Sequence, residues 1–226
     1  MFPTWLTVVA WVSIGSAFVC AGIILVDVSR HRQKMAIMNW VWPITALYAG
    51  PLAVWGYFRI GRPSSKEASE QAGGKSPAKP FWEAVAVGVT HCGAGCTLGD
   101  IIAEFVVFFA GLSVAGSVLG AEFIGDYILA YVLGIVFQYF SIAPMRGLSF
   151  GPGVWAAIKA DTLSLTAFEI GLFGWMALTY FVFFHPHLKP NQPTYWLMMQ
   201  VGMLIGFVTA YPMNWWLIRR GLKETM

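Results

Sequence analysis

The sequence predicts an all-α integral membrane protein, a polytopic helical bundle of about six transmembrane helices. Apolar residues make up 58% of its 226 residues, whereas Asp, Glu, Lys and Arg together make up only 11%. A soluble domain contains about 25% charged residues, so this chain has too few to cover a surface in water. Eleven Trp and seventeen Phe fit a protein that faces lipid and anchors aromatic side chains at the membrane interfaces. We therefore expect the lipid bilayer as its surroundings.

Six apolar segments account for the predicted spans, because an α-helix needs about 20 residues to cross the hydrocarbon core. They are residues 5–26, 38–57, 82–112, 123–142, 163–184 and 195–218. Pro43 and Pro51 are expected to bend the second segment, since proline disrupts helical hydrogen bonds. The third segment is too long for one straight span. Its glycines at Gly93, Gly95 and Gly99 predict a break or a short re-entrant piece there, and the alternative is a tilted helix.

A polar segment divides the chain into two membrane units. Residues 62–80 are rich in Ser, Gly, Ala and Lys, a composition that predicts a flexible loop. Residues 1–61 then form a two-helix unit, and residues 81–226 form a four-helix unit that contains the polar residues described below.

Six spans would place both termini on the same side of the membrane. Lys and Arg concentrate in cytoplasmic loops. Cytoplasmic termini put ten of the fourteen Lys and Arg residues inside and four outside, so we expect both termini in the cytoplasm. The cluster SRHRQK at residues 29–34 opposes this assignment, because it would lie outside.

Ionisable side chains stand inside the third predicted span, in the stretch HCGAGCTLGDIIAE. They are Cys92, Cys96, Asp100 and Glu104, with His91 directly before them. The thiols and carboxyls follow one another at intervals of four, which on an α-helix gives one slowly drifting stripe. Ionisable groups in lipid are costly to bury, so this stripe is a hypothesis for a functional site.

A soft-metal site is the first interpretation of the stripe. Thiolate and imidazole are ligands that suit Cu(I) and Zn(II), and thioethers also favour Cu(I). Cys92 and Cys96, one helical turn apart, can both reach one ion, and His91 and Asp100 can add ligands. Glu104 then supplies counter-charge or an onward path for the cation.

A thiol pair that cycles between dithiol and disulfide is the second interpretation. Side chains four apart on a helix have Cβ atoms about 5–6 Å apart. A disulfide needs about 3.5–4.5 Å. The redox interpretation therefore requires Gly93 and Gly95 to break the helix.

Other interpretations stay open. His91, Asp100 and Glu104 can hold a catalytic zinc with an open water position, as in an intramembrane hydrolase. A non-enzymatic assembly partner can use the stripe to bind another membrane protein. Structurally, Cys is a small buried hydrophobe and carboxyls can link helices through hydrogen bonds.

Further candidate ligands lie outside the stripe. Asp161 and Glu169, eight residues apart in KADTLSLTAFEIG, share a helix face and can extend a cation path. Asp161 can instead be the N-cap of the fifth span. Met38 and Met213 are the best placed thioethers, because each adjoins an Asn near a membrane end.

The last span contains the small-residue pair Gly202 and Gly206. This GxxxG pattern lets a helix pack closely on a neighbour or on a second protomer, so a homo-oligomer through this face is expected. The sequence contains no phosphate-binding glycine loop, no nucleophile elbow and no basic stripe for nucleic acid. A non-enzymatic function without nucleic acid is therefore preferred.

Four stretches resemble a prokaryotic multi-pass membrane family of unknown function, domain of unknown function 4396. They are HCGAGCTLGDIIAE, QYFSIAPMRGLS, KADTLSLTAFEIGLFGWMA and YPMNWWLIRRGLKETM. The resemblance covers most of the chain from about Trp82 onward and implies a prokaryotic inner membrane protein. It implies no defined activity, but its association with copper-handling contexts favours Cu(I) over Zn(II).

The sequence thus predicts a soft-metal protein for metal transport or copper tolerance. Cys92 and Cys96 are the predicted thiolate ligands and His91 an additional ligand, with the carboxyls of Asp100 and Glu104 beside them. A membrane thiol–disulfide oxidoreductase is the alternative from the enzyme class.

Overall fold

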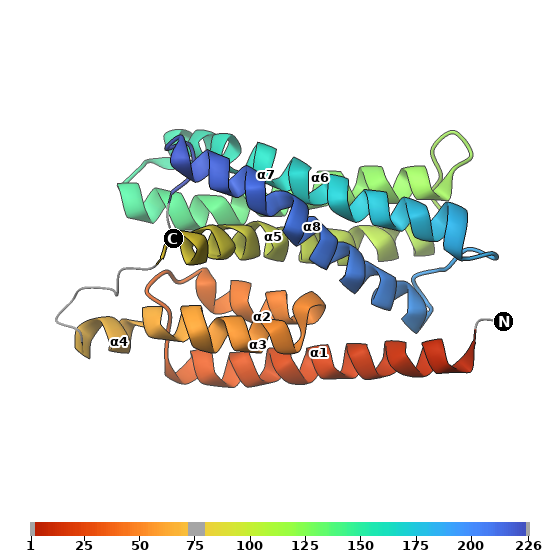
Figure 1. Cartoon of the computed structure of the whole chain (residues 1–226). Helices are drawn as coiled ribbons and strands as arrows, with labels where there is room; N and C mark the ends of the chain where they lie inside the picture. Colours follow the sequence, from red (N-terminus) through yellow and green to blue (C-terminus); the bar gives the residue numbers. More distant parts are fainter. Residues whose placement is uncertain (1–2, 72–79, 225–226) are drawn as a thin grey trace.

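A computed structural model describes residues 3–71 and 80–224, and it is a bundle of helices (Figure 1). The long helices are α1 (Thr4–Arg30), α5 (Phe81–Ala110), α6 (Val118–Arg146), α7 (Phe150–Leu178) and α8 (Pro193–Arg219). The shorter elements are α2 (Met38–Ala49), α3 (Pro51–Gly56), η1 (Tyr57–Gly61), η2 (Arg62–Ser64), α4 (Lys66–Gln71) and η3 (Thr179–Phe183). The described residues contain no strand, so the predicted all-α class is confirmed.

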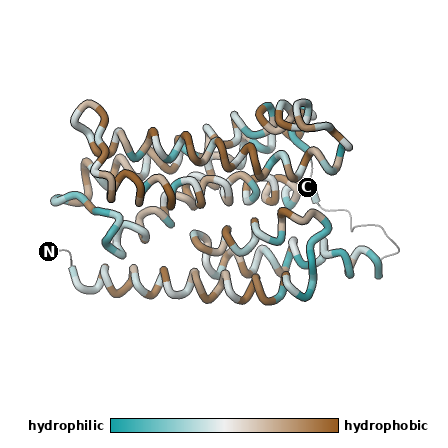
Figure 2. Tube along the Cα trace, turned by 180° about the vertical axis from the view of Figure 1, so that it is seen from behind, coloured by the Kyte–Doolittle hydropathy of each residue, from teal (hydrophilic) through white to brown (hydrophobic). Residues whose placement is uncertain are grey.

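Five helices are long and apolar enough to cross a membrane within the described residues, rather than the six predicted. They are the five long helices, with η3 continuing α7. Figure 2 shows apolar residues along these helices and hydrophilic residues gathered where the chain turns, most densely around α4. The integral membrane class that the composition predicts is therefore confirmed.

The predicted second span is a hairpin and not a span. α2 ends at Gly50, whose φ of +50° favours glycine, and Pro51 starts the returning helix where its missing N–H costs no bond. The returning chain reaches the start of the hairpin again, because Lys66 N–H donates to the carbonyl of Arg32 at 2.9 Å. We call residues 38–61 the α2–α3 hairpin. It enters and leaves at the same end of the bundle (Figure 1).

The base of the hairpin is tied to the end of α1 by Asp27. The Tyr57 hydroxyl donates to Asp27 Oδ2 at 2.7 Å, and Arg62 Nη1 lies 3.1 Å from Asp27 Oδ1. η2 and α4 follow, within the segment predicted as a polar loop. Residues 72–79 of that segment lie outside the described residues.

α5 is the most buried of the five long helices and is unbroken, so the predicted break within residues 93–99 is wrong. Its glycines serve close approach instead. A Cβ on Gly95 would lie 3.0 Å from the Cα of Gly134, and a Cβ on Gly99 would lie 2.4 Å from the backbone N of Ala130. α5 and α6 therefore touch backbone to backbone, a contact that only glycine at these positions permits.

The Gly202 and Gly206 face packs on a neighbouring helix within the chain, which is the first of the two possibilities that the GxxxG pattern allows, and a homo-oligomer stays a prediction. A Cβ on Gly202 would lie 2.6 Å from Leu172 Cδ1, and a Cβ on Gly206 would lie 2.8 Å from the Phe168 carbonyl oxygen. Both contacts are with α7, which covers this side of α8.

The two described chain ends lie at opposite ends of the bundle, because the number of spans is odd (Figure 1). The expectation that both termini share one side is therefore wrong. Eleven of the twelve described Lys and Arg residues lie near the end where α1, α6 and α8 finish, which we call the basic end. They are Arg30, Arg32, Lys34, Arg59, Arg62, Lys66, Arg146, Lys159, Arg219, Arg220 and Lys223. Lys189, in the α7–α8 connection, lies at the opposite end.

Substituting Gly99 with Ala should destabilise the bundle, because the added methyl meets backbone atoms that cannot yield without separating α5 from α6. Overpacking of this kind costs about 1–3 kcal/mol. The melting temperature of the purified protein in detergent measures it. Gly15→Ala on α1, which meets no atom within 4 Å, is the matched control and should keep or slightly raise the melting temperature, because alanine favours the helix. Equal melting of both variants would contradict this packing.

Candidate functional site

A line of buried polar side chains runs through the interior of α5–α8, and we call it the polar line. Its members are Cys92, Cys96, Asp100 and Glu104 of α5, Glu122 and Asp126 of α6, Asp161, Ser164 and Glu169 of α7, and Lys223 of the tail. Between Gly88 and Glu104 the line follows α5 for about 24 Å, at 1.5 Å per residue. That length covers most of a hydrocarbon core of about 30 Å.

The basic end of the polar line is closed by Lys223. Its ammonium is fully buried and donates to the carbonyl of Gly88 and to Ser164 Oγ, both at 3.2 Å. Asp161 Oδ1 lies 3.9 Å from Lys223 Nζ and supplies the counter-charge. Asn214 of α8 also donates to Ser164, at 2.8 Å, so this end is well connected.

The tail reaches this position by folding back after α8. Gly221 adopts a φ of +67°, which turns the chain. Arg146 of α6 forms an ion pair with Glu224 and fixes the residue beside Lys223. Asp161 is not an N-cap, because α7 begins at Phe150, eleven residues earlier, so that alternative is wrong.

The two thiols lie in the middle of the polar line. Cys92 neighbours Asp161, and Cys96 neighbours Cys92, Asp100 and Glu169. Both thiols are free and buried. Because α5 continues through its glycines, the Cβ atoms keep the helical separation of about 5–6 Å, which is too long for a disulfide. The condition that the redox interpretation requires is therefore not met.

Carboxyls crowd the half of the line away from Lys223. Glu104 neighbours Asp126 of α6, Glu122 and the Tyr195 hydroxyl of α8. Within residues 3–71 and 80–224, several buried carboxyl oxygens have no hydrogen-bond partner. They are both oxygens of Asp100, both of Glu169, Oε2 of Glu104 and Oδ1 of Asp126, together with both oxygens of Asp161, which has the ion-pair contact with Lys223. Buried polar atoms are rarely left unpaired, and ionisable groups at membrane depth mark a candidate functional site.

His91 lies off the polar line, although it is adjacent to Cys92 in sequence. Its ring packs edge-on to Phe137 of α6, with ring centroids 6.2 Å apart. Phe137 belongs to the apolar cluster shared with the α2–α3 hairpin, whereas the two thiols belong to the cluster with α7 and α8.

The predicted thioethers are also apart from the thiols. Met38 packs in the apolar cluster between α1 and the α2–α3 hairpin, and Met213 is half-buried on α8. Other methionines, Met199 and Met203 of α8, share the buried cluster of the thiols. The positions of the methionines along α8 do not by themselves predict that Met199 and Met203 lie near the thiols.

A preassembled metal centre of three or more ligands is not found in the part of the chain that the structure describes. His91, Cys92, Cys96, Asp100 and Glu104 extend along α5 and do not converge on one point. Of these predicted ligands, the two thiols are close enough to each other to share one ion. The predicted zinc hydrolase needs three protein ligands and a water at one ion, so this arrangement supports it least.

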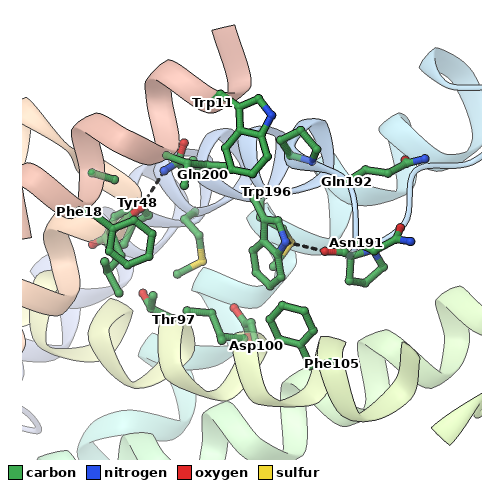
Figure 3. Close-up of a pocket in the computed structure, with 18 residues that line it drawn as sticks. Trp11, Phe18, Tyr48, Thr97, Asp100, Phe105, Asn191, Gln192, Trp196 and Gln200 are labelled. Carbon is green, nitrogen blue, oxygen red and sulfur yellow. Dashed lines mark hydrogen bonds between the residues drawn. The ribbon is translucent and has the colours of Figure 1, made fainter. Parts of the chain in front are cut away.

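A cavity of about 440 Å³ lies beside the polar line, between α1, α2, α5 and α8. Figure 3 shows Thr97, Asp100 and Phe105 of α5 on one side, with Trp11, Gln200 and Trp196 facing them. Asp100 thus belongs both to the polar line and to the cavity wall.

Several members of the line escaped the sequence analysis. Asp126 and Glu122 of α6 lie outside the stretch of the third predicted span and are not among the candidate ligands that the sequence predicts. Their spacing of four on α6, in register with the small residues Ala130 and Gly134 that face α5, is the signal that could have found them. Lys223 carries no comparable signal, because it follows the last span and resembles an ordinary flanking charge.

The fold and the polar line define a polytopic membrane protein with an ionisable interior. Residues 81–223 match the family described as "Domain of unknown function (DUF4396)", and since this is more than half of the chain, the protein belongs to that family. The match contains α5–α8 and the whole polar line. Comparison with curated proteins and with solved structures gave no match.

Breaking the Lys223–Asp161 pair should destabilise the fold, because the remaining charge is left buried without a partner. Lys223→Met or Asp161→Asn should each cost about 3–5 kcal/mol. The double variant should lose much less than the sum, since neither charge remains. Thermal unfolding of the three variants in detergent measures this coupling. Lys189→Met, at an exposed position, is the control, and additive losses would contradict the pair.

Proposed function

We propose that the protein transports a cation across the membrane along the polar line. The observation that supports this most is the series of unpartnered buried carboxyl oxygens, which extends from the thiols toward the end opposite Lys223. Carboxyls on α5 are one turn apart, a rise of about 6 Å, so a cation leaving one can reach the next. Ionisable groups at this depth are retained in membrane proteins mainly for ion and proton paths.

Cu(I) is the cation that we propose the thiols select, in preference to Zn(II). Two thiolates are enough for a soft monovalent ion, and Cys92 and Cys96 are neighbours on an unbroken helix face. Met199 and Met203 share their buried cluster and add soft thioethers. Zn(II) prefers four ligands in a tetrahedral arrangement, which this pair alone does not supply.

Lys223 is expected to control the basic end of the path. Its ammonium occupies the position between Asp161, Ser164 and Gly88 that an arriving cation would need. A cation leaving the thiols toward the basic end must therefore displace the tail. Copper tolerance, as the biological role, is a proposal that follows from this transport.

We further propose that the basic end faces the cytoplasm of a prokaryotic cell, with the N-terminus outside and the C-terminus inside. Eleven of twelve described Lys and Arg residues lie at this end. The positive-inside rule then favours the orientation strongly. The cluster at residues 29–34 now agrees with it, because α1 ends at the basic end.

Reporter fusions test the orientation. Alkaline phosphatase fused after residue 226 should be inactive, because the enzyme matures only outside the cytoplasm, whereas a fluorescent protein there should be bright. Alkaline phosphatase inserted between α5 and α6, after residue 113, should be active. The same insertion after residue 147, between α6 and α7, is the control and should be inactive. The reverse pattern would contradict the orientation.

Copper binding tests the thiols. Purified wild-type protein loaded with Cu(I) under reducing conditions should retain about one ion per chain, since two thiolates share one soft ion. Cys92→Ser and Cys96→Ser should each lower the retained copper, and the double variant should reach background. Cys20→Ser, the third cysteine, lies in the apolar cluster of α1 and is the matched control.

The outcomes separate the candidate functions. If wild type retains no more copper than the double variant, the metal proposal is wrong. A Cys92–Cys96 disulfide that turns over with quinone, detected by non-reducing mass spectrometry, would favour the oxidoreductase. Stable co-purification of another membrane protein, without copper, would favour the assembly partner. In vesicles, Glu104→Gln should slow Cu(I) uptake while the thiols still bind the ion, since this carboxyl lies on the path and not at the thiols.

A further inference from the structure

The cavity exists because the α2–α3 hairpin is shorter than its neighbours. The hairpin turns back at Gly50, while α1 and α8 continue toward the end opposite the basic end. The space beyond the tip is the cavity, and the tip residues Leu47 and Tyr48 form part of its wall. A volume of about 440 Å³ is that of a site for a small organic molecule.

Hydrogen bonds between three elements hold the cavity walls in place. Gln200 of α8 donates to the carbonyl of Leu47 in the hairpin tip at 2.8 Å. The Ser13 hydroxyl of α1 donates to the Gln200 side-chain oxygen at 2.6 Å. Trp196 is fixed by its own bond to the Pro190 carbonyl at 2.7 Å, so its ring is left to face the cavity (Figure 3). The cavity is therefore formed before a ligand arrives.

One acidic group reaches the cavity without a partner. Asp100 is 1% exposed, and neither of its carboxyl oxygens has a hydrogen-bond partner in the described part of the chain. The Tyr48 hydroxyl, also on the wall, is likewise unpartnered there. Thr97 is already committed, since it donates to the Gly93 carbonyl at 2.6 Å. The cavity thus has a single acidic group on a wall that is mostly apolar.

Aromatic rings supply the rest of the recognition chemistry. Trp11, Phe18, Phe105 and Trp196 line the cavity around Asp100. Aromatic faces attract cations through their quadrupole, most strongly where water is excluded. A buried carboxylate needs a positive partner, and the described ion pairs give Asp100 none. A hydrated metal ion gains little from such walls, whereas an apolar amine satisfies both features.

We propose that the cavity is a binding site for an organic cation, an amine or quaternary ammonium with an apolar body. Its charge lies against Asp100 and its body against the tryptophan and phenylalanine rings. Asn191 and Gln192, in the connection before α8, form a polar rim at the end opposite the basic end. The ligand then arrives from that side. This site shares Asp100 with the proposed cation path but does not involve the thiols, because neither Cys92 nor Cys96 lines the cavity.

Radiolabelled benzyltrimethylammonium, a permanent cation of suitable size, tests the site in purified full-length protein. Saturable binding of one molecule per chain is expected. Asp100→Asn should weaken it by about tenfold or more, because both the ion pair and the desolvated charge are lost. Glu83→Gln is the matched control, since it removes another buried carboxyl of α5 that neither lines the cavity nor belongs to the polar line, and it should leave binding unchanged.

A second pair of variants covers the case in which Asp100→Asn fails to fold. Trp11→Leu, on the cavity wall and largely exposed to lipid, should weaken binding severalfold, whereas Trp5→Leu on the same helix should not. The neutral carbon analogue, 2,2-dimethylpropylbenzene, should compete poorly. Absence of saturable binding, equal competition by the neutral analogue, or equal loss in Asp100→Asn and Glu83→Gln would each overturn the proposal. Copper retention by the cysteine variants is measured separately, so the two proposals can fail independently.

Discussion

Water is absent from the hydrocarbon core of a membrane, and ionisable groups there must be enclosed by protein. The arrangement of α5–α8 follows from this constraint. α5 bears the thiols and two carboxyls, and three other helices surround it so that each group is buried. Glycines at the contacts make the enclosure tight, since Gly95 and Gly99 let the α6 backbone approach α5. The close packing of these helices is therefore what keeps the polar line away from lipid.

The enclosure is charged unevenly along its length. Lys223 and Asp161 neutralise each other at the basic end, whereas the carboxyls farther along have no cation from the described chain. If stability alone were selected, apolar residues would stand in place of these carboxyls, because well-packed apolar side chains usually stabilise a protein interior as much as buried ionisable groups or more. These carboxyl oxygens without a hydrogen-bond partner are the observation on which the proposed cation path rests.

Much of the site could be predicted from the sequence because one helix contains it. Cys92, Cys96, Asp100 and Glu104 follow a helical interval, and the composition fixes the membrane class. Their partners on α6, α7 and α8 could not be predicted, since helix contacts depend on packing between distant segments. The hairpin could not be predicted from hydropathy, because hydropathy is averaged over a whole segment. A single residue with positive φ, Gly50, reverses the direction of the chain within that segment. Continuity of α5 likewise depended on neighbours, since Gly95 and Gly99 fit against α6 and do not break the helix.

The cavity wall and the polar line lie largely in different parts of the sequence, so the two can change separately during evolution. The family match begins at residue 81 and contains the polar line, whereas the hairpin tip and α1, which wall the cavity, precede it. Substitutions in the first sixty residues can therefore reshape the cavity, or change which molecule fits it, without touching a thiol or carboxyl of the line. Under the two proposals, ligand preference and ion transport can therefore change separately, and Asp100 is the residue of the polar line that also lines the cavity.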